Sequence, residues 1–596
     1  MVVLGLGGRA ARTSSHESSA APYEEDAGPQ ERHYKRFWGL AAIWVGFVAF
    51  LVFQLFRWQV FEREQLVSIA QAQMASKGNE YVSVRGEILD CQNHLLAVDI
   101  FQYDLWATPR EVRKHNDVDK ISAQLAPLLG LTKEEVRKPL QSERPYVLLA
   151  SRVSEAVWRA IDSDPDLNLT GFDWDVKPKR VYPEGPLGAH VLGFVNASHE
   201  GYYGVEGYYD RRLLGGKPEK GEAQANGGAA AWYDPLDLRA GDKLVLTLDR
   251  TIQHVAEQEL VAALKAFEAP SGAIIVMDPR TGAILAMANF PTFDPNHFMD
   301  TPQGRFANPA ISEQYEPGSV FKVITIAAGI DSGIITPRTT FEDTGKIEVG
   351  GRPIYNWDRG SNGLVDMTQV LAKSLNTGAA YVSVTLGKNR FYNYVRRFGF
   401  GRLTEVDMAG EIAGTAKMPG DSDWYESDLG TNAFGQGIAV TPLQMIRAVA
   451  AVANRGQLMK PYVVKQIVSG DHVFEVEPTV VRRVVSAATA EQVTAMMVRA
   501  VETEIAVAYI PGHTIAGKTG TAEIPTPGGY KSEETIASFI GYAPAYDPRF
   551  IVLVKIDRPR KSPWGSKVAA PVFRRVAQFL FDYMNIPPDN AGLIAR

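Results

Sequence analysis

The sequence predicts a membrane-anchored α/β (α+β) protein whose larger part is exported. Three observations predict this class: one long apolar run near the N-terminus, an ordinary globular composition, and strand and helix patterns at both ends of the region 246–596. The chain has 596 residues, of which 45% are hydrophobic and 22% are charged. Such usage excludes a wholly disordered, collagen-like or polytopic membrane protein, and the length allows more than one hydrophobic core.

Charge and cysteine content exclude further classes. The formal net charge is −6, which gives no overall basic field for a nucleic-acid backbone, so we expect no nucleic-acid partner. Cys91 is the single cysteine and can form neither an internal disulfide nor a cysteine-rich zinc site. A redox-sensing thiol and a tolerated substitution both remain open for it.

The apolar run covers residues 37–56, which are 20 positions without a charged side chain. At about 1.5 Å per residue, a helix of this length spans roughly 30 Å, the thickness of the hydrocarbon core. Arg32, Lys35 and Arg36 precede it and favour a cytoplasmic N-terminus. A cleaved signal peptide would have a shorter apolar stretch, and the all-round apolar surface argues against a buried soluble helix. We therefore predict an uncleaved transmembrane signal anchor over 37–57.

The segments on either side of the anchor differ in character. Residues 1–36 have too few large apolar side chains to fold alone, so we predict a disordered cytoplasmic tail. After the anchor, residues 83–107 alternate as strand, turn and strand, with an Asn-His pair at the turn. Residues 118–140 have helical spacing, and residues 215–234 are Gly- and Ala-rich without periodicity, which indicates a flexible connection.

The second half contains the patterns of a sheet with flanking helices. Its expected strands and helices are a strand at 243–249, a helix at 252–267, a hairpin at 271–289 that turns at 280–282, strands at 538–544 and 549–557, and a last helix at 570–584. A region of this size with strands at both ends is sufficient for a catalytic domain.

The first candidate catalytic motif is S-x-x-K, formed by Ser319 and Lys322. Pro317 and Gly318 break the chain and helical spacing follows, so Ser319 should stand at a helix N-terminus with Lys322 on the same face. A lysine whose pKa is lowered by burial or by a second cation can take the serine proton, and N–H groups at a helix start can stabilise an oxyanion. In isolation, the same residues could be a capping serine and a surface lysine.

Two further motifs follow downstream. Ser374 and Asn376 form S-x-N, in which the serine could relay a proton and the amide could bind a substrate carbonyl and position the lysine. A strand at 516–523 would present a cation, hydroxyls and backbone N–H groups along one edge, where a peptide carboxylate could dock; these groups belong to Lys518, Thr519, Gly520 and Thr521. Taken singly, the first motif could be an ordinary helix end and the second a turn with a solvated lysine.

S-x-x-K, S-x-N and K-T-G in this order resemble the signature of serine penicillin-binding proteins and β-lactamases. The chain after the anchor resembles the class B high-molecular-mass penicillin-binding proteins in particular. In the catalytic half the resemblance extends to residues 278–289, 293–296, 315–319, 434–445 and 454–461; upstream, residues 84–90, 180–195 and 204–216 resemble the family's R-G-x-I-x-D, Y-P…H-x-x-G and G-x-E elements. Cys91, Asn93 and His94 depart from the family's usual Arg-Asn-Gly continuation, which puts the local turn in question.

The resemblance implies a domain order and an architecture. Residues 58–245 would form an elongated α+β pedestal domain of the dimerisation type, and residues 246–596 the penicillin-binding transpeptidase domain, with a central antiparallel sheet flanked by helices. The tail (1–36) and the anchor (37–57) would precede them, so that both domains lie outside the cytoplasmic membrane.

The resemblance also implies a reaction, serine-type D,D-transpeptidation of peptidoglycan stem peptides. Ser319 would be the nucleophile and Lys322 its base, while Ser374 and Asn376 would shuttle protons and hold the substrate amide. The K-T-G-T strand would bind the donor carboxylate through Lys518 and Thr519, and the backbone N–H groups of Ser319 and Thr521 would form the oxyanion hole. β-Lactams would acylate Ser319, and no metal or organic cofactor is expected.

Other functions share parts of this pattern. A bifunctional class A enzyme would need a glycosyltransferase domain after the anchor, and a β-lactamase or β-lactam sensor would not need the pedestal. A D,D-carboxypeptidase shares the site, and a scaffold that activates a glycan polymerase would tolerate mutated motifs, whereas all three motifs are intact here. Within class B, the compact pedestal and residues 146–161 favour a division (septal) enzyme over an elongation enzyme. The expected partners are lipid-linked precursor strands, a SEDS-type glycan polymerase and division-complex membrane proteins.

Overall fold

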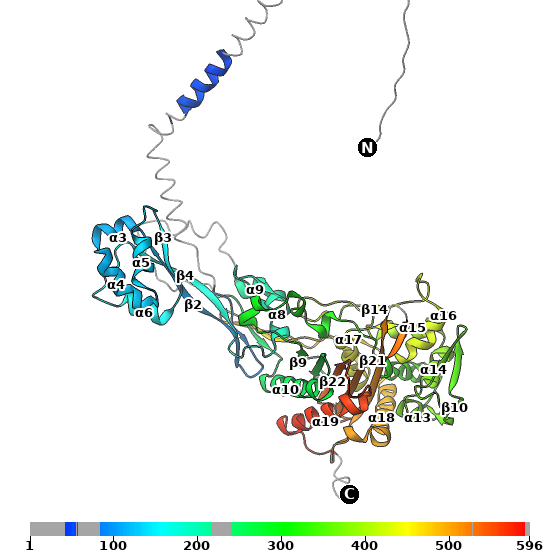
Figure 1. Cartoon of the computed structure of the whole chain (residues 1–596). Coiled ribbons are helices and arrows are strands. Elements are labelled where there is room, and N and C mark those ends of the chain that lie inside the picture. The colour runs from blue at the N-terminus through cyan, green and yellow to red at the C-terminus, as the bar shows by residue number, and fades with distance from the viewer. Residues whose placement is uncertain (1–41, 55–56, 58–83, 216–239, 527–528, 590–596) are drawn as a thin grey trace, which may run out of the picture. The chain divides into compact units, whose positions relative to one another are not determined.

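The computed structural model describes residues 42–54, 57, 84–215, 240–526 and 529–589, which are drawn in colour in Figure 1. The predicted tail and nearly all of the predicted connection at 215–234 lie outside these residues. Within the predicted anchor, residues 42–54 are helical and their side chains are mostly exposed. In the described ranges, no helix combines the length and the hydropathy needed to cross a membrane.

A seven-stranded sheet organises the pedestal region, with the order β18-β17-β7-β1-β2-β3 and with β4 also paired to β2. Its strands are β1 (Ile88–Leu89), β2 (Leu95–Ala107), β3 (Val147–Ser154), β4 (Phe172–Val181), β7 (Lys243–Leu246), β17 (Val464–Ser469) and β18 (His472–Glu475). Strands β17 and β18 come from far downstream in the sequence; β17 pairs with β7, and β18 pairs with β17. The sheet therefore combines strands from both sides of residue 245.

Four helices form a small lobe at one end of the long β2–β4 pair (Figure 1). They are α3 (Pro109–His115), α4 (Val118–Leu129), α5 (Lys133–Leu140) and α6 (Glu155–Asp162), and they bury a separate apolar core against β2 and β3. The predicted helical stretch 118–140 is thus two helices. Gly130 separates them because it adopts a left-handed conformation with φ 68°, which is readily available only to glycine.

The backbone geometry at the start of the pedestal explains why a glycine follows Arg85 and how the turn between β1 and β2 closes. Gly86 lies against the neighbouring backbone, since a Cβ there would be 2.0 Å from the carbonyl oxygen of Asp242. In the turn between β1 and β2, Asn93 takes the left-handed conformation with φ 67°, a region that Asn tolerates better than most residues. The carboxylate of Asp90 accepts hydrogen bonds from the backbone N–H of His94 at 2.8 Å. The turn therefore closes without a glycine at position 94.

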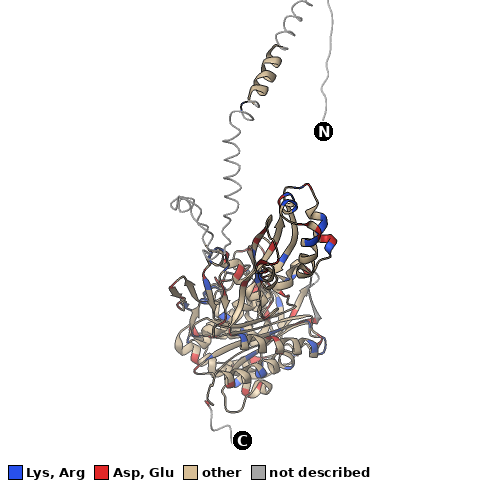
Figure 2. Cartoon of the chain, turned by 90° about the vertical axis from the view of Figure 1, so that its left-hand side faces the viewer, with Lys and Arg blue, Asp and Glu red and all other residues tan. Residues whose placement is uncertain are grey.

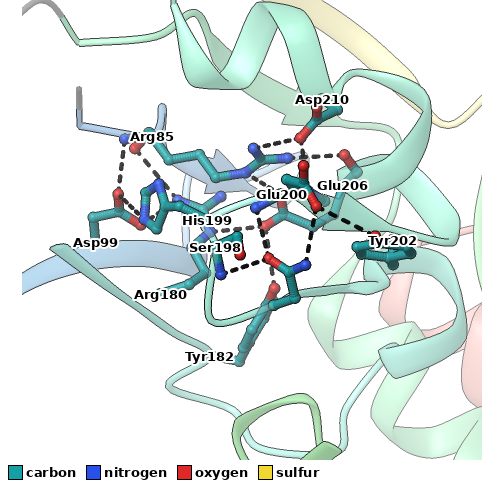
Figure 3. A network of polar contacts seen from close by, with 12 residues as sticks. Arg85, Asp99, Arg180, Tyr182, Ser198, His199, Glu200, Tyr202, Glu206 and Asp210 are labelled. Atoms are coloured by element: carbon teal, nitrogen blue, oxygen red, sulfur yellow. Dashed lines mark hydrogen bonds and ion pairs between the residues drawn. The ribbon is translucent and has the colours of Figure 1, made fainter. Parts of the chain in front are cut away.

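The resembling segments of the pedestal meet in one buried polar network, shown in Figure 3. Arg85 Nε donates to Glu206 Oε2 at 2.5 Å, and Arg85 Nη1 donates to Asp210 Oδ1 at 2.7 Å. Arg180 Nε donates to Glu206 Oε1 at 2.7 Å, and the Tyr182 hydroxyl donates to the same oxygen at 3.3 Å. Arg85 and Glu206 are 1% and 0% exposed, so each charge depends on the other to remain buried.

A five-stranded antiparallel sheet forms the centre of the second domain, with the order β20-β21-β22-β8-β9. Its strands are β8 (Ser271–Met277), β9 (Ile284–Phe290), β20 (Ala516–Thr526), β21 (Gly529–Ala543) and β22 (Phe550–Asp557). Helices α10 (Arg250–Phe267) and α19 (Gly565–Tyr583) pack on one face, against Ile274 and Val554 among others. Alternate residues such as Ile275 and Leu553 face the other core, which α12 (Lys322–Asp331) and α17 (Pro442–Ala453) complete.

The remaining elements surround this sheet and join it to the pedestal. The helices are α7 (Ala189–Leu192), α8 (Gly204–Tyr208), α9 (Asp210–Leu214), α11 (Pro309–Ser312), α13 (Met367–Ala372), α14 (Asn376–Leu386), α15 (Lys388–Arg397), α16 (Glu426–Thr431) and α18 (Ala487–Glu504), with short 3-10 turns η3 (Pro295–Asp300), η4 (Gln303–Arg305), η5 (Gly318–Phe321), η6 (Asn432–Phe434) and η7 (Ala506–Ala508). The short strands are β5 (Phe194–Val195), β6 (Gly201–Tyr202), β10 (Thr340–Asp343), β11 (Lys346–Val349), β12 (Arg352–Tyr355), β13 (Gly363–Asp366), β14 (Thr415–Ala416), β15 (Ile438–Ala439), β16 (Gln457–Met459) and β19 (Val480–Arg483). Lys and Arg are interspersed with Asp and Glu along the described ribbon (Figure 2), in keeping with the small net charge.

Candidate active site

The S-x-x-K motif lies where η5 runs into α12. Gly318 adopts a left-handed φ of 58°, and Ser319 follows it in the 3-10 turn, half-buried. Lys322 is the first residue of α12, and its Nζ lies 3.0 Å from Ser319 Oγ. The helix start is a 3-10 turn rather than a regular α-helical turn, which still brings residues three apart onto one side.

Lys322 is the centre of the site. Its side chain is fully buried, and its Nζ donates to the Ser374 carbonyl at 2.5 Å, to Ser374 Oγ at 3.2 Å and to Asn376 Oδ1 at 2.8 Å. Burial, together with the positive charge of Lys518, lowers the pKa of Lys322 well below its ordinary value. A neutral amine beside a serine hydroxyl has the properties of a general base.

The S-x-N motif occupies the connection between α13 and α14. Ser374 has a left-handed φ of 62°, and its hydroxyl accepts hydrogen bonds from both Lys322 and Lys518, the latter at 3.0 Å. Asn376 is the first residue of α14, and its Nδ2 donates to the carbonyl of Tyr355 at 3.0 Å. One hydroxyl therefore connects two lysines, which gives a path for a proton between them.

The K-T-G-T residues lie on β20, at the edge of the five-stranded sheet. Lys518 is fully buried, and burial lowers its pKa to about 7; its Nζ also donates to the Thr519 carbonyl at 3.0 Å. Gly520 has no room for a side chain, since a Cβ would lie 2.3 Å from Ser538 Oγ. The hydroxyl of Thr521 accepts a hydrogen bond from the backbone N–H that begins α19, at 3.1 Å.

The outer edge of β20 faces the turn that carries Ser319. Among the described residues β20 pairs with β21 alone, and on its other side a Cβ at Gly318 would lie 3.1 Å from the carbonyl oxygen of Thr521. An unpaired strand edge offers backbone N–H and C=O groups to an extended peptide. The described carboxylates form no ion pair with Lys322 or Lys518, so neutral oxygens are the hydrogen-bond partners of both amines.

Several aromatic residues lie near the site without being predicted as site residues, although Phe434 begins the resembling segment 434–445. Phe434 in η6 lies under Lys322, with Nζ 5.9 Å from the ring centre. The side chains of Trp357 and Trp564 meet edge to face with ring centres 5.0 Å apart, and they come from the loop after β12 and from the residue before α19. Aromatic residues in loops have no periodic signal, so only the fold could bring these together. In the described part of the chain, no cluster of three or more His, Cys, Asp or Glu could hold a metal ion.

Two protein-family models match the chain. Residues 272–578, just over half of the sequence, match the penicillin binding protein transpeptidase domain. Residues 81–230 match the penicillin-binding protein dimerisation domain, in the region where a bifunctional class A enzyme would carry its glycosyltransferase.

Individual relatives extend over most of the chain. Stage V sporulation protein D of Bacillus subtilis is 32% identical over 543 residues, which are 88% of this chain and 82% of that protein. Peptidoglycan D,D-transpeptidase FtsI of Escherichia coli is 30% identical over 553 residues, 91% of this chain and 90% of that protein. Among solved structures, penicillin binding protein 3 of Mycobacterium tuberculosis complexed with aztreonam is similar with a TM-score of 0.66 and 27% identity, over 85% of this chain and 97% of that one.

The fold, the lysine–serine site and these matches define a penicillin-binding protein with a transpeptidase domain. Because a dimerisation domain precedes that domain, and because full-length relatives share both, the chain belongs to the class B penicillin-binding proteins.

Proposed function

We propose that this peptidoglycan D,D-transpeptidase works through an acyl-enzyme on Ser319. The chain is an enzyme of cell-wall synthesis, in keeping with the transpeptidase domain and with the relative named peptidoglycan D,D-transpeptidase FtsI. One observation supports the choice of nucleophile above all: the buried amine of Lys322, with its lowered pKa, lies 3.0 Å from Ser319 Oγ.

Acylation begins when Ser319 Oγ attacks the carbonyl carbon of the penultimate D-Ala in a stem pentapeptide. Lys322 takes the hydroxyl proton, and the backbone N–H groups of Ser319 and Thr521 stabilise the oxyanion. The C–N bond then breaks, the departing terminal D-Ala receives a proton through Ser374, and the acyl group remains as an ester on Ser319.

Deacylation reverses these roles with a different partner. An amine from a neighbouring stem peptide attacks the ester carbonyl, loses a proton to the lysine–serine pair, and leaves with the acyl group while Ser319 regains its proton. Lys518 and Thr519 bind the donor carboxylate at the edge of β20, and Asn376 holds the substrate amide. Since water could replace the amine, D,D-carboxypeptidase activity is the alternative reaction at the same residues.

β-Lactams acylate the same serine in this proposal. The solved relative with aztreonam supports it, and another structure of that relative is described as complexed with ampicillin. A strained lactam ring opens onto Ser319 and leaves no free amine to depart, so the ester persists. A scaffolding role beside a polymerase would add to this chemistry rather than replace it, because the lysine–serine site is complete.

We further propose a septal rather than an elongation role, in a single-pass membrane protein with a cytoplasmic N-terminus and an extracytoplasmic catalytic domain. Support comes from the segment 146–161, which forms β3 and α6, and from the match to FtsI over 91% of this chain. The anchor over 37–57 would hold the protein beside a SEDS-type polymerase and division-complex membrane proteins. Arg85 and Asp90 are each 1% exposed, so an exposed part of the pedestal would have to make that contact.

Labelling with a fluorescent penicillin tests the nucleophile. The full chain in detergent should be labelled covalently, and Ser319→Ala should abolish the label while the unfolding temperature stays the same, because one half-buried hydroxyl is lost. Ser332→Ala is a matched control, since it removes a half-buried hydroxyl just after the other end of α12 and should label normally. Equal labelling of Ser319→Ala and the unchanged protein would contradict the assignment.

A further inference from the structure

A fully buried carboxylate, Asp343, lies at the end of β10 and outside the three motifs. Its Oδ1 accepts from Gly345 N at 3.1 Å, from Asn356 Nδ2 at 3.0 Å and from Thr377 Oγ1 at 2.8 Å. Its Oδ2 accepts from Asn356 Nδ2 at 2.9 Å and from the backbone and side-chain N–H groups of Asn362 at 3.0 and 2.8 Å. Both oxygens are thus saturated by neutral donors.

The charge of Asp343 is kept by hydrogen bonds alone. Burial by itself would raise the pKa of this carboxyl, but the donors from Asn362, Thr377, Gly345 and Asn356 outweigh it and hold the pKa below the ordinary value. No described Lys, Arg or His forms an ion pair with it. A buried carboxylate that is saturated by neutral donors fixes the direction of each donor, because every one has to point at the same two oxygens.

Two of these donors are neighbours in sequence of Asn376 and of the residue that binds its side chain. Thr377 follows Asn376 directly, and its backbone N–H also donates to Asn356 Oδ1 at 3.3 Å. Asn356 follows Tyr355, whose carbonyl accepts the hydrogen bond from Asn376 Nδ2. A carbonyl can only accept, so it binds the NH₂ side of the Asn376 amide and turns Oδ1 toward Lys322, 2.8 Å away.

We propose that Asp343 is a positioning residue for the transpeptidase reaction, which acts through Thr377 and Asn356 to fix the Asn376 amide against Lys322. The proposal rests on the proposed function, in which Lys322 is the base and Asn376 holds the substrate. Asp343 touches neither the nucleophile nor the substrate. It sets the start of α14 and the strand end of β12 at one fixed separation, and the Asn376 side chain spans that separation.

Asp343→Asn tests the proposal because it keeps the shape and removes one acceptor. The new NH₂ group faces donors from Asn356, Asn362 or Thr377, so at least one of them loses its partner. We measure the acylation of the full chain in detergent by a chromogenic cephalosporin, and separate the rate at saturation from the half-saturating concentration. The rate at saturation should fall on the order of 10–100-fold, as for a misplaced catalytic group, while the half-saturating concentration changes less than about three-fold.

Two further variants separate positioning from folding. Asp407→Asn is the matched control, since Asp407 is a buried carboxylate that accepts from Val463 N, Val464 N and the Tyr209 hydroxyl, in contact with the pedestal rather than with the site. It should leave the acylation rate per folded molecule unchanged. Thr377→Val removes a single donor to Asp343 and should lower the rate in the same direction, and it replaces Asp343→Asn in the test if that variant does not fold.

A double-mutant cycle tests whether Asp343 acts on acylation through Asn376. Asn376→Ala should slow acylation by itself, and adding Asp343→Asn to it should cost little more, because the group that Asp343 positions is already gone. If the fold-reductions in acylation rate of the two single variants multiply in the double variant, the proposal is overturned. It is also overturned if Asp343→Asn or Thr377→Val acylates at the unchanged rate. The proposed function fails separately, if Ser319→Ala is still labelled by penicillin.

Discussion

The hydroxyl of Ser374 distinguishes this site, because it accepts hydrogen bonds from two buried lysines, Lys322 and Lys518. Two ammonium groups that share one oxygen in a buried site repel each other, so at least one of them favours the neutral form. Lys322 has the stronger reason to be neutral, since both burial and Lys518 act on its pKa. This difference supports the proposed roles, in which Lys322 is the base and Lys518 the cation.

The first prediction concerns Lys322, the proposed base. Lys322→Ala should slow acylation at saturating substrate by about 10²–10⁴-fold, the usual contribution of a general base. The rate at saturation measures this directly with a fluorescent or chromogenic β-lactam. Lys388→Ala, which removes an exposed lysine that pairs with Glu426, should leave the rate unchanged. A Lys322→Ala protein that acylates normally would exclude the lysine as base.

The second prediction at this scale concerns Lys518, which should bind carboxylates while it is charged. Since its pKa is about 7 in the free enzyme, it loses its proton as the pH rises through that value, and the half-saturating concentration for carboxylate-bearing substrates should then increase. Lys518→Ala should raise that concentration and remove its dependence on pH. Substrate analogues without a carboxylate should show neither effect. If they are weakened equally, Lys518 does not anchor the carboxylate.

The structure bears on the two interpretations of Cys91 that the sequence leaves open, a redox-sensing thiol and a tolerated substitution. Its Sγ lies 3.6 Å from Asp249 Oδ2, and burial together with the charges of Asp249 and Asp90 raises the pKa of the thiol to about 12. The thiolate is the reactive form of cysteine, so a raised pKa disfavours the reactive form of Cys91 near neutral pH. The tolerated substitution is the interpretation that fits.

Local motifs were predictable at the residue scale, and distant partners were not. Ser319 and Lys322 are three residues apart, so their contact follows from the geometry of one turn. Asp343 and Thr377 are 34 residues apart, and Tyr355 contributes only a backbone carbonyl, which any residue could supply. No pattern in the sequence therefore indicates the groups that we propose to orient Asn376.

Helices and strands with a regular local pattern were likewise predictable from the sequence, whereas a local break and a pairing between distant segments were not. The hairpin at 271–289 and the last helix are visible as β8, β9 and α19, because their apolar periods are regular. The break at Gly130 was missed because the periodicity continues across it. The pairing of β17 with β7 was also missed, since nothing in a strand of six residues specifies a partner more than two hundred positions away.

The element-scale prediction concerns the pedestal network in Figure 3. Arg85→Ala removes the bond from Nε to the Glu206 carboxylate and the bond to Asp210. It leaves the Glu206 carboxylate, which is 0% exposed, with Arg180 as its remaining cation. Breaking a buried ion pair costs about 3–5 kcal/mol, and the free energy of unfolding measured in urea should fall by about that amount. Arg137→Ala, in a solvent-exposed pair with Glu134, should change it by less than about 1 kcal/mol. Equal effects of the two variants would exclude a special role for the network.

At the scale of the whole molecule, two sheets connect the catalytic domain to the pedestal. Strands β17 and β18 belong to the pedestal sheet but follow α17 in the chain, and α17 packs on the five-stranded sheet. The chain therefore passes directly from α17, one of the helices of the core around Lys322, to strands of the pedestal sheet. The domain order was predictable from the sequence because each domain has its own motifs, whereas the exchange of strands across residue 245 depends on long-range pairing.

The last prediction concerns where the full chain works. If the protein is a septal transpeptidase, a fluorescent fusion to its N-terminus should concentrate at the division site late in the cell cycle. Ser319→Ala should accumulate at the same place, because its loss affects chemistry and not the surface of the pedestal. Exchanging residues 146–161 for the corresponding segment of an elongation-type enzyme should disperse the fusion, while penicillin labelling at Ser319 persists since that segment lies in β3 and α6, away from the motifs. A fusion that follows the side wall throughout growth would instead assign the enzyme to elongation, with the same acyl-enzyme chemistry on Ser319.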